Sequence, residues 1–211
     1  MGMRNITELM QKAHELKEKG FTTGEIADEL NISKETALWL VTRETEAKKK
    51  VPRDIHIDWS VVGSNPAVLK HLSLALSDLI KAMVKENNLP QPDVIAGIAD
   101  SGIPIATIIA EDMNVSLSVI RPKKHMWGPD KKSTQAGFIL SNFSQVKGKN
   151  VVIVDDITTT GTTIKDTIKL LNEKGANPLA AVVLIDKKGI KSIEGKPVKA
   201  LVSVSIVEDL K

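Results

Sequence analysis

The first fifty residues carry apolar side chains at helical spacing and show no strand-like alternation. Their pattern predicts three helices, over residues 6–19, 24–30 and 34–48. We expect Thr22 or Thr23 to cap the second helix and Ser33 to cap the third, because hydroxyl side chains accept hydrogen bonds from the first free N–H groups of a helix. Pro52 ends this segment, since proline cannot continue a helix.

After residue 52, short apolar runs alternate with amphipathic segments. Strands are predicted at 94–98, 117–121, 151–154, 179–185 and 198–207, and helices from Pro66 onward and at 104–113 and 163–174. Continuous apolar strands separated by helices are typical of a mostly parallel sheet covered on both faces. We therefore expect an α/β domain over residues 51–211, preceded by a small all-α domain over residues 1–50.

Composition narrows the functional classes. The chain has no cysteine among its 211 residues, which excludes disulfides, thiolate nucleophiles and cysteine-based metal sites. No apolar run has the roughly 18–20 residues of a membrane span, so we expect a cytoplasmic protein without a membrane partner. The net charge is +3, so any contact with nucleic acid must be local.

The strongest chemical pattern lies in residues 151–163, where a buried strand leads into two acids and a threonine-rich loop. Ligands of open α/β sheets bind at the carboxyl ends of strands. The carboxylates of Asp155 and Asp156 suit a vicinal diol, and free N–H groups at a helix start suit a phosphate. We expect ribose on the two acids and a 5′-phosphate on Thr158, Thr159, Thr160, Gly161, Thr162 and Thr163.

This segment resembles the phosphoribosyl-pyrophosphate (PRPP) signature of type I phosphoribosyltransferases, and the resemblance covers about residues 52–211. Residues 93–106 look like the pyrophosphate loop of that family. The resemblance implies pyrophosphate contacts from Ala99, Asp100, Ser101, Gly102 and Arg121. It also implies a Mg²⁺ ion that arrives with PRPP and is held mainly by pyrophosphate and sugar oxygens, without direct protein ligands.

The stretch 121–137 corresponds to the basic catalytic loop of orotate-type members. Arg121 matches that pattern, and Pro122 replaces a lysine. In an ungapped alignment His125 takes the position of the catalytic lysine, whereas a gapped alignment places Lys124 there. A neutral histidine supplies no permanent cation for a leaving pyrophosphate. The sequence therefore predicts PRPP binding and leaves turnover open.

Residues 23–40 resemble a helix-turn-helix. Ala27 is small where two helices would cross, and Leu30 and Ile32 would fill the space around the turn. The helix after the turn would be the recognition helix. We expect DNA contacts from Ser33, Lys34, Glu35, Thr36 and Arg43. The alternative is a helical oligomerisation or lid domain, since residues 1–50 carry nine basic and nine acidic side chains.

A helix-turn-helix joined to a phosphoribosyltransferase domain resembles the archaeal orotate-phosphoribosyltransferase-like transcriptional regulators of the GfcR type. The match includes Asp58-Trp59 and Gly63-Ser64 between the domains. The resemblance implies a homodimer that binds a palindromic operator in double-stranded DNA, senses PRPP or a related phosphosugar, and controls sugar or nucleotide metabolism. The rival hypothesis is an active phosphoribosyltransferase, for orotate or another base, with an accessory helical domain.

Overall fold

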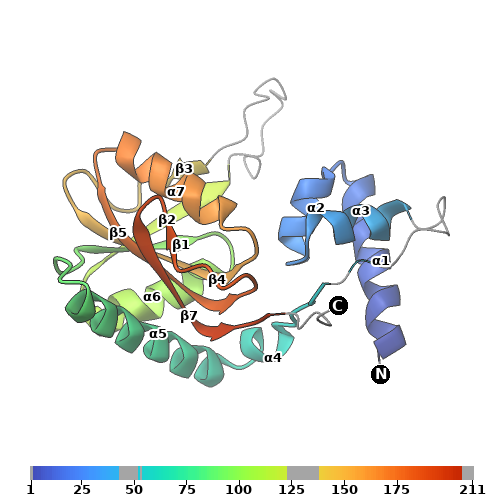
Figure 1. Cartoon of the computed structure of the whole chain (residues 1–211), viewed down its shortest axis with the longest axis horizontal. Helices are drawn as coiled ribbons and strands as arrows, with labels where there is room; N and C mark the ends of the chain where they lie inside the picture. Colours follow the sequence, from blue (N-terminus) through green and yellow to red (C-terminus); the bar gives the residue numbers. More distant parts are fainter. Residues whose placement is uncertain (1, 43–51, 53, 123–137, 206–211) are drawn as a thin grey trace, which may run out of the picture. The chain divides into compact units, whose positions relative to one another are not determined.

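The chain folds into two compact units, which we call the helical unit (Met1–Trp59) and the sheet unit (Ser60–Lys211). The computed structural model describes residues 2–42, 52, 54–122 and 138–205 (Figure 1). The division falls later than residue 50 because residues 54–59 belong to the helical unit. In particular, the backbone N–H of Ser33 donates to Oδ2 of Asp54 at 2.6 Å.

Three helices form the helical unit: α1 (Gly2–Glu18), α2 (Thr23–Glu29) and α3 (Lys34–Thr42). Thr22 is the N-cap of α2 and forms a capping box with Glu25, so the first of the two expected caps is the one used. The predicted continuation of the third helix over 43–48 lies outside the described residues. The helices are held by one apolar cluster, whose buried members are Ala13, Ile26, Ala27, Leu30, Ile32, Ala37, Trp39, Leu40 and Val41.

The sheet unit alternates helices and strands along the chain. Its elements are α4 (Ser60–Gly63), α5 (Pro66–Glu86), β1 (Val94–Ile98), α6 (Gly102–Met113), β2 (Ser116–Pro122), β3 (Phe138–Leu140), β4 (Asn150–Thr158), α7 (Thr162–Glu173), β5 (Asn177–Asp186), β6 (Ser192–Ile193) and β7 (Lys196–Ser203). Asn65 caps α5 and Pro66 occupies its first turn, as the sequence predicts. No helix within the described ranges is long and apolar enough to cross a membrane.

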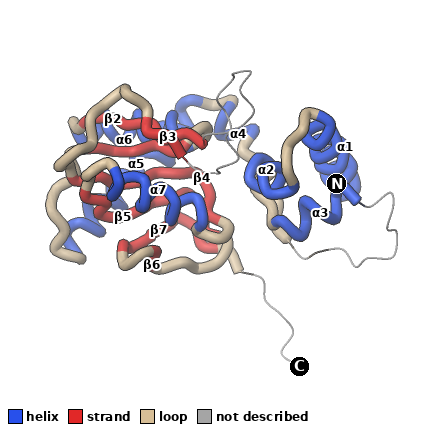
Figure 2. The backbone as a smooth tube through the Cα atoms, turned by 90° about the horizontal axis from the view of Figure 1, so that it is seen from above, coloured by secondary structure: helices blue, strands red, loops and turns tan. Residues whose placement is uncertain are grey.

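The strands form one sheet in the order β3-β2-β1-β4-β5-β7-β6. The pairs formed by β2, β1, β4, β5 and β7 are parallel, and the short edge strands β3 and β6 pair antiparallel. Helices α5 and α6 cover one face of the sheet and α7 covers the other, as Figures 1 and 2 show. The mostly parallel, doubly covered sheet predicted from the sequence is confirmed.

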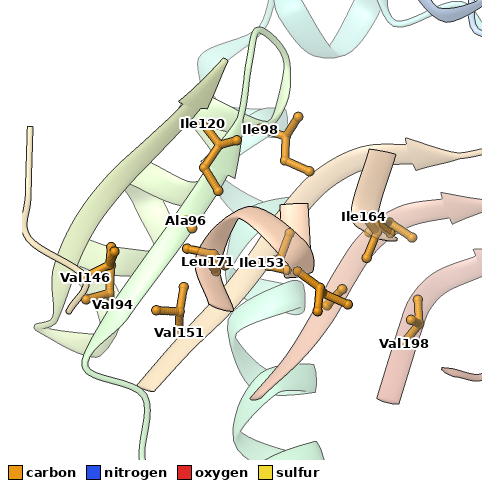
Figure 3. Close-up of a cluster of buried hydrophobic side chains, with 13 residues drawn as sticks. Val94, Ala96, Ile98, Ile120, Val146, Val151, Ile153, Ile164, Leu171 and Val198 are labelled. Atoms are coloured by element: carbon orange, nitrogen blue, oxygen red, sulfur yellow. The ribbon is translucent and has the colours of Figure 1, made fainter. Parts of the chain in front are cut away.

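The core beneath α7 fixes this helix on the sheet. Ile164 and Leu171 of α7 belong to one buried cluster with Val94 of β1 and Ile153 of β4 (Figure 3). Burying one such side chain contributes roughly 1.5–3 kcal/mol relative to exposing it. Because α7 begins beside the carboxyl end of β4, this packing also determines where its N-terminus lies.

Strand β4 is longer than predicted. The sequence placed its end at Val154, but the ladder with β5 continues through the pairs Asp155–Val183 and Thr158–Asp186. Because acidic residues are uncommon in strands, the two aspartates suggested that the strand ends before them. Pairing with β5 extends the strand beyond that point. The two carboxylates therefore lie within the strand, in its carboxyl-terminal half.

Candidate functional site

Two adjacent carboxylates are buried at the carboxyl end of β4. Asp155 is 9% exposed and Asp156 is 8% exposed. The two acids are in direct contact, since the backbone N–H of Asp156 donates to Oδ1 of Asp155 at 2.9 Å. Oδ2 of Asp156 is buried and meets no hydrogen-bond partner in the described part of the chain. Such an orphaned acceptor is costly unless a ligand donates to it.

The loop between β1 and α6 packs against these acids. The hydroxyl of Ser101 interacts with the Asp156 carboxyl. A Cβ added at Gly102 would lie 2.7 Å from the carbonyl oxygen of Val154 and 3.3 Å from Oδ1 of Asp155. Only glycine fits so close an approach, so the loop over 99–102 is held directly beside β4.

The remaining residues expected around a pyrophosphate lie at the same edge of the sheet. The Ala99–Asp100 peptide bond is cis. The backbone N–H of Ala99 donates to the carbonyl of Ile120 at 2.8 Å, which ties the loop to β2. Arg121 follows Ile120 directly, and its side chain is exposed. The structure thus brings together, along the carboxyl ends of β1, β2 and β4, the segments that the sequence assigned to one ligand.

The threonine-rich loop connects β4 to α7. Thr158 ends β4 and is buried, Thr160 is exposed, and α7 begins at Thr162. The hydroxyls of Thr160 and Thr162 lie 2.9 Å apart. Gly161 is the N-cap of α7 with a φ of +78°, and it makes no side-chain cap. The N–H of Thr162 donates to Oγ1 of Thr160 at 3.4 Å, and Gly161 adds no capping side chain, so the N-terminus of α7 suits an anion.

Sequence reasoning missed the loop after β5, which supports the threonine loop. Asp186 is 2% exposed, and its carboxylate accepts hydrogen bonds from the backbone N–H groups of Lys188 and Ile190. A Cβ added at Gly161 would lie 3.1 Å from Ile190 Cδ1 and 2.7 Å from Ile193 Cδ1. The signal that could have found Asp186 is the one used for Asp155: an acid directly after a buried apolar strand.

Burial determines the electrostatics of the acid pair. It raises the pKa of the Asp156 carboxyl above its ordinary value, and the hydrogen-bonding contributions of Asp155, nearby backbone groups and Ser101 oppose the rise. A ligand hydroxyl that donates to Oδ2 would stabilise the ionised form. These groups therefore fit a diol beside a phosphate: two carboxylates accept hydrogen bonds from the hydroxyls, and the N-terminus of α7 suits the anion.

The described residues of the predicted DNA-contact set lie at the start of α3. Ser33 and Thr36 face each other: their hydroxyls are 2.8 Å apart, and the Thr36 N–H donates to Oγ of Ser33 at 3.1 Å. Lys34 and Glu35 are exposed. The first pair thus forms the N-terminal cap of α3, and the second pair is accessible to solvent.

Three predicted residues cannot be placed, since Lys124, His125 and Arg43 lie outside the described residues. Within the described ranges, no three His, Asp or Glu side chains are grouped so as to hold a metal ion.

Comparison with known proteins assigns the chain to a family. Residues 58–208 match the family described as the phosphoribosyl transferase domain. The transcriptional regulator GfcR of Methanocella arvoryzae is 42% identical over 208 residues, which cover 98% of this chain and all of that protein. GfcR of Haloferax volcanii is 40% identical over 209 residues, covering 96% of this chain and 97% of the relative.

The chain belongs to the GfcR family of transcriptional regulators. GfcR 1 of Methanosarcina barkeri, 43% identical over 204 residues, agrees. The family resemblance predicted from the sequence is confirmed, and membership supports a role in transcription regulation. Because the matches to GfcR proteins extend over nearly the whole chain, the helical unit belongs to the family as much as the sheet unit does.

Solved structures show that the sheet unit of this GfcR family member has the type I phosphoribosyltransferase fold. Adenine phosphoribosyltransferase of Thermoanaerobacter pseudethanolicus matches with a TM-score of 0.57 at 19% identity, over 73% of this chain and 90% of that one. The Saccharomyces cerevisiae enzyme matches with a TM-score of 0.54 at 23% identity, over 74% and 90%. At these identities the likeness establishes the fold alone.

Proposed function

We propose that the chain is a DNA-binding transcriptional regulator whose sheet unit binds PRPP, or a related phosphosugar, as its effector. One observation carries the effector proposal: the buried carboxylate Asp156 presents an unpartnered Oδ2 near the carboxyl end of β4, the strand that leads into the threonine loop and α7. A ribose hydroxyl donating to that oxygen would offset the cost of burying it. The 5′-phosphate would then lie against the threonine loop, over residues 158–163.

Magnesium enters this proposal with the ligand. The pyrophosphate and sugar oxygens would supply most of its coordination, because Mg²⁺ keeps several waters and uses few protein ligands when phosphates are present. The pyrophosphate itself would lie along the loop 99–102, whose Gly102 is packed against β4. In this arrangement the chain's own residues bind and orient the phosphosugar.

The DNA-binding part of the proposal rests on the helical unit. Helix α3 follows α2 after a short turn, is capped by Ser33, and is the second helix of the expected helix-turn-helix. GfcR relatives are named transcriptional regulators, which implies a DNA partner. We expect a homodimer, because one such unit reads few base pairs and two related by symmetry would match a palindromic operator.

The effector proposal is tested by thermal unfolding with and without PRPP and Mg²⁺. A ligand that binds the folded state alone raises Tm by mass action. The wild type should show this rise, and Asp155→Ala and Asp156→Ala should abolish it. Asp166→Ala is the matched control, because Asp166 is an exposed aspartate on α7. An undiminished rise in both site variants would place the phosphosugar elsewhere.

A further inference from the structure

Helix α3 carries an exposed apolar residue to which the sequence pattern gives no role. Leu38 is 48% exposed, although its neighbours Ala37, Trp39 and Leu40 are all buried in the core of the helical unit. Among the residues from 6 to 42, Ile6 on α1 is the other large apolar side chain that remains exposed. Leu38 lies one turn after Lys34, so the two side chains share a face of the helix.

The polar residues that precede Leu38 on α3 have contacts of their own. The hydroxyls of Ser33 and Thr36 are engaged with each other in the cap of α3. The Lys34 side chain lies along α2, since a Cβ added at Gly24 would be 3.4 Å from Lys34 Cε. A cation at the margin of the face suits a phosphate, which is recognised by charge, whereas the centre of the face meets base edges.

We propose that Leu38 contacts the C5-methyl group of a thymine in each operator half-site. This inference rests on the proposed DNA binding and names the chemistry that it reads. The thymine methyl is the apolar feature of the major groove. A side chain without hydrogen-bonding groups can contact this methyl, whereas it could not satisfy the polar edge of another base. Lys34 beside it supplies the charge complementarity for the flanking phosphate.

The test begins with selection of duplexes from a random pool by the full chain. Each thymine of the selected duplex is then replaced in turn by deoxyuracil, which lacks the methyl group and keeps every hydrogen-bonding atom. For the wild type we expect one position in each half-site where this replacement weakens binding about fourfold, the scale of burying one methyl group. Leu38→Gln should bind the thymine and deoxyuracil duplexes equally.

Two controls separate this contact from other roles. Ile6→Gln makes the same kind of change at the other exposed apolar residue and should keep the thymine preference. Leu38→Gln should leave the salt dependence of binding unchanged, whereas Lys34→Ala should reduce its slope by about one.

Three outcomes are distinct. Selection of no duplex would contradict the proposed function itself. Duplex binding that is insensitive to deoxyuracil at every position would overturn the role of Leu38 alone. A change in oligomeric state on Leu38→Gln, with the thymine preference kept, would assign the exposed leucine to a contact between two copies of the chain and would also overturn the proposal.

Discussion

At the scale of single residues, Asp156 combines burial with an unpartnered oxygen. Its neighbour Asp155 differs, because Oδ1 of Asp155 accepts the N–H of Asp156 at 2.9 Å. A buried acceptor without a partner destabilises the folded chain, and native structures keep few of them. Asp156 is therefore the position where stability and ligand binding should be most clearly opposed.

Asp156→Asn should raise Tm at neutral pH. Burial raises the pKa of this carboxyl, so the folded state binds the proton more tightly than the unfolded chain does. The resulting stability is present below the unfolded pKa of about 3.9 and is lost as pH rises through the higher folded pKa. Thermal unfolding across this pH range should show that loss in the wild type and not in Asp156→Asn.

The same variant should lose the rise in Tm on adding PRPP and Mg²⁺, because an amide cannot replace the carboxylate as an acceptor for both ligand and neighbours. Asp166→Asn, on the exposed side of α7, should behave as the wild type in both measurements. A Tm at neutral pH no higher than that of the wild type, with the same pH dependence, would show that burial of Asp156 carries no such cost.

Gly161→Ala should destabilise the chain more than Gly189→Ala. Both glycines have positive φ, +78° and +68°, so alanine costs roughly 1–2 kcal/mol of backbone strain at either. At Gly161 the new Cβ would also lie 2.7 Å from Ile193 Cδ1, whereas at Gly189 it meets nothing within 4 Å. Denaturant unfolding compares the two, and equal losses would mean that Ile193 yields without cost.

At the scale of elements, the start of α3 is fixed from two directions. Its own cap residue Ser33 accepts the Thr36 N–H, and the Asp54 carboxylate accepts the Ser33 N–H. Residues 56–59 then line a shallow pocket of about 160 Å³ together with residues of α1 and the end of α2. The segment that leads to the sheet unit is thus hydrogen-bonded to the helix proposed to read DNA.

Asp54→Ala should weaken this attachment. We expect the free energy of unfolding to fall by at most about 1.5–3 kcal/mol, the range for a hydrogen bond to a charged group. The loss should be at the low end of this range because the contact is only partly buried. Amide exchange at Ser33 should become faster. Glu8→Ala, which removes an exposed carboxylate from α1, is the control. Unchanged exchange at Ser33 would contradict the contact.

The stretch 121–137, which resembles a basic catalytic loop, predicts little or no enzymatic turnover. With orotate, PRPP and Mg²⁺ we expect little or no loss of orotate absorbance, because His125 in place of a lysine supplies no permanent cation to the leaving pyrophosphate. Residues 123–137 lie outside the described part of the structure, so the sequence alone carries this expectation. Robust turnover that Lys124→Ala abolishes would favour the enzyme hypothesis and the gapped alignment.

Long, strongly patterned elements were predictable and short or tertiary ones were not. The strand over 94–98 was predicted with its observed bounds, because its apolar run is continuous and ends in a loop. Strands β3 and β6 were missed, since two or three residues carry no periodicity and depend on pairing with β2 and β7. The cap at Ser33 was readable, but its bond to Asp54 spans 21 positions and has no local signal.

The residues of the candidate site also fall into those that the sequence could predict and those that it could not. The acids of β4 and the threonine–glycine loop could be proposed as a site from the sequence, because they lie in one short segment. Asp186 and the apolar contacts around Gly161 were missed because they come from the next strand and appear only when β4 and β5 pair. Leu38 was missed because helical periodicity does not distinguish an exposed leucine from a core one.

At the scale of the whole molecule, two proposed binding sites lie on one chain. The sheet unit would bind the phosphosugar and the helical unit would bind DNA. Asp54, in the segment that leads toward the sheet unit, accepts the N–H of Ser33 at the start of α3. If PRPP changes the affinity for DNA, then DNA must change the affinity for PRPP by the same factor. This reciprocity distinguishes a sensor from a chain that merely carries two independent binding sites.

The most direct test is a fluorescence-anisotropy titration of a selected palindromic duplex, with and without saturating PRPP and Mg²⁺. The account predicts that the affinity for DNA differs between the two conditions and that Asp156→Asn, which retains the helix-turn-helix, removes the difference. Equal affinity in both conditions, while thermal unfolding shows that PRPP is bound, would contradict the effector role of the sheet unit.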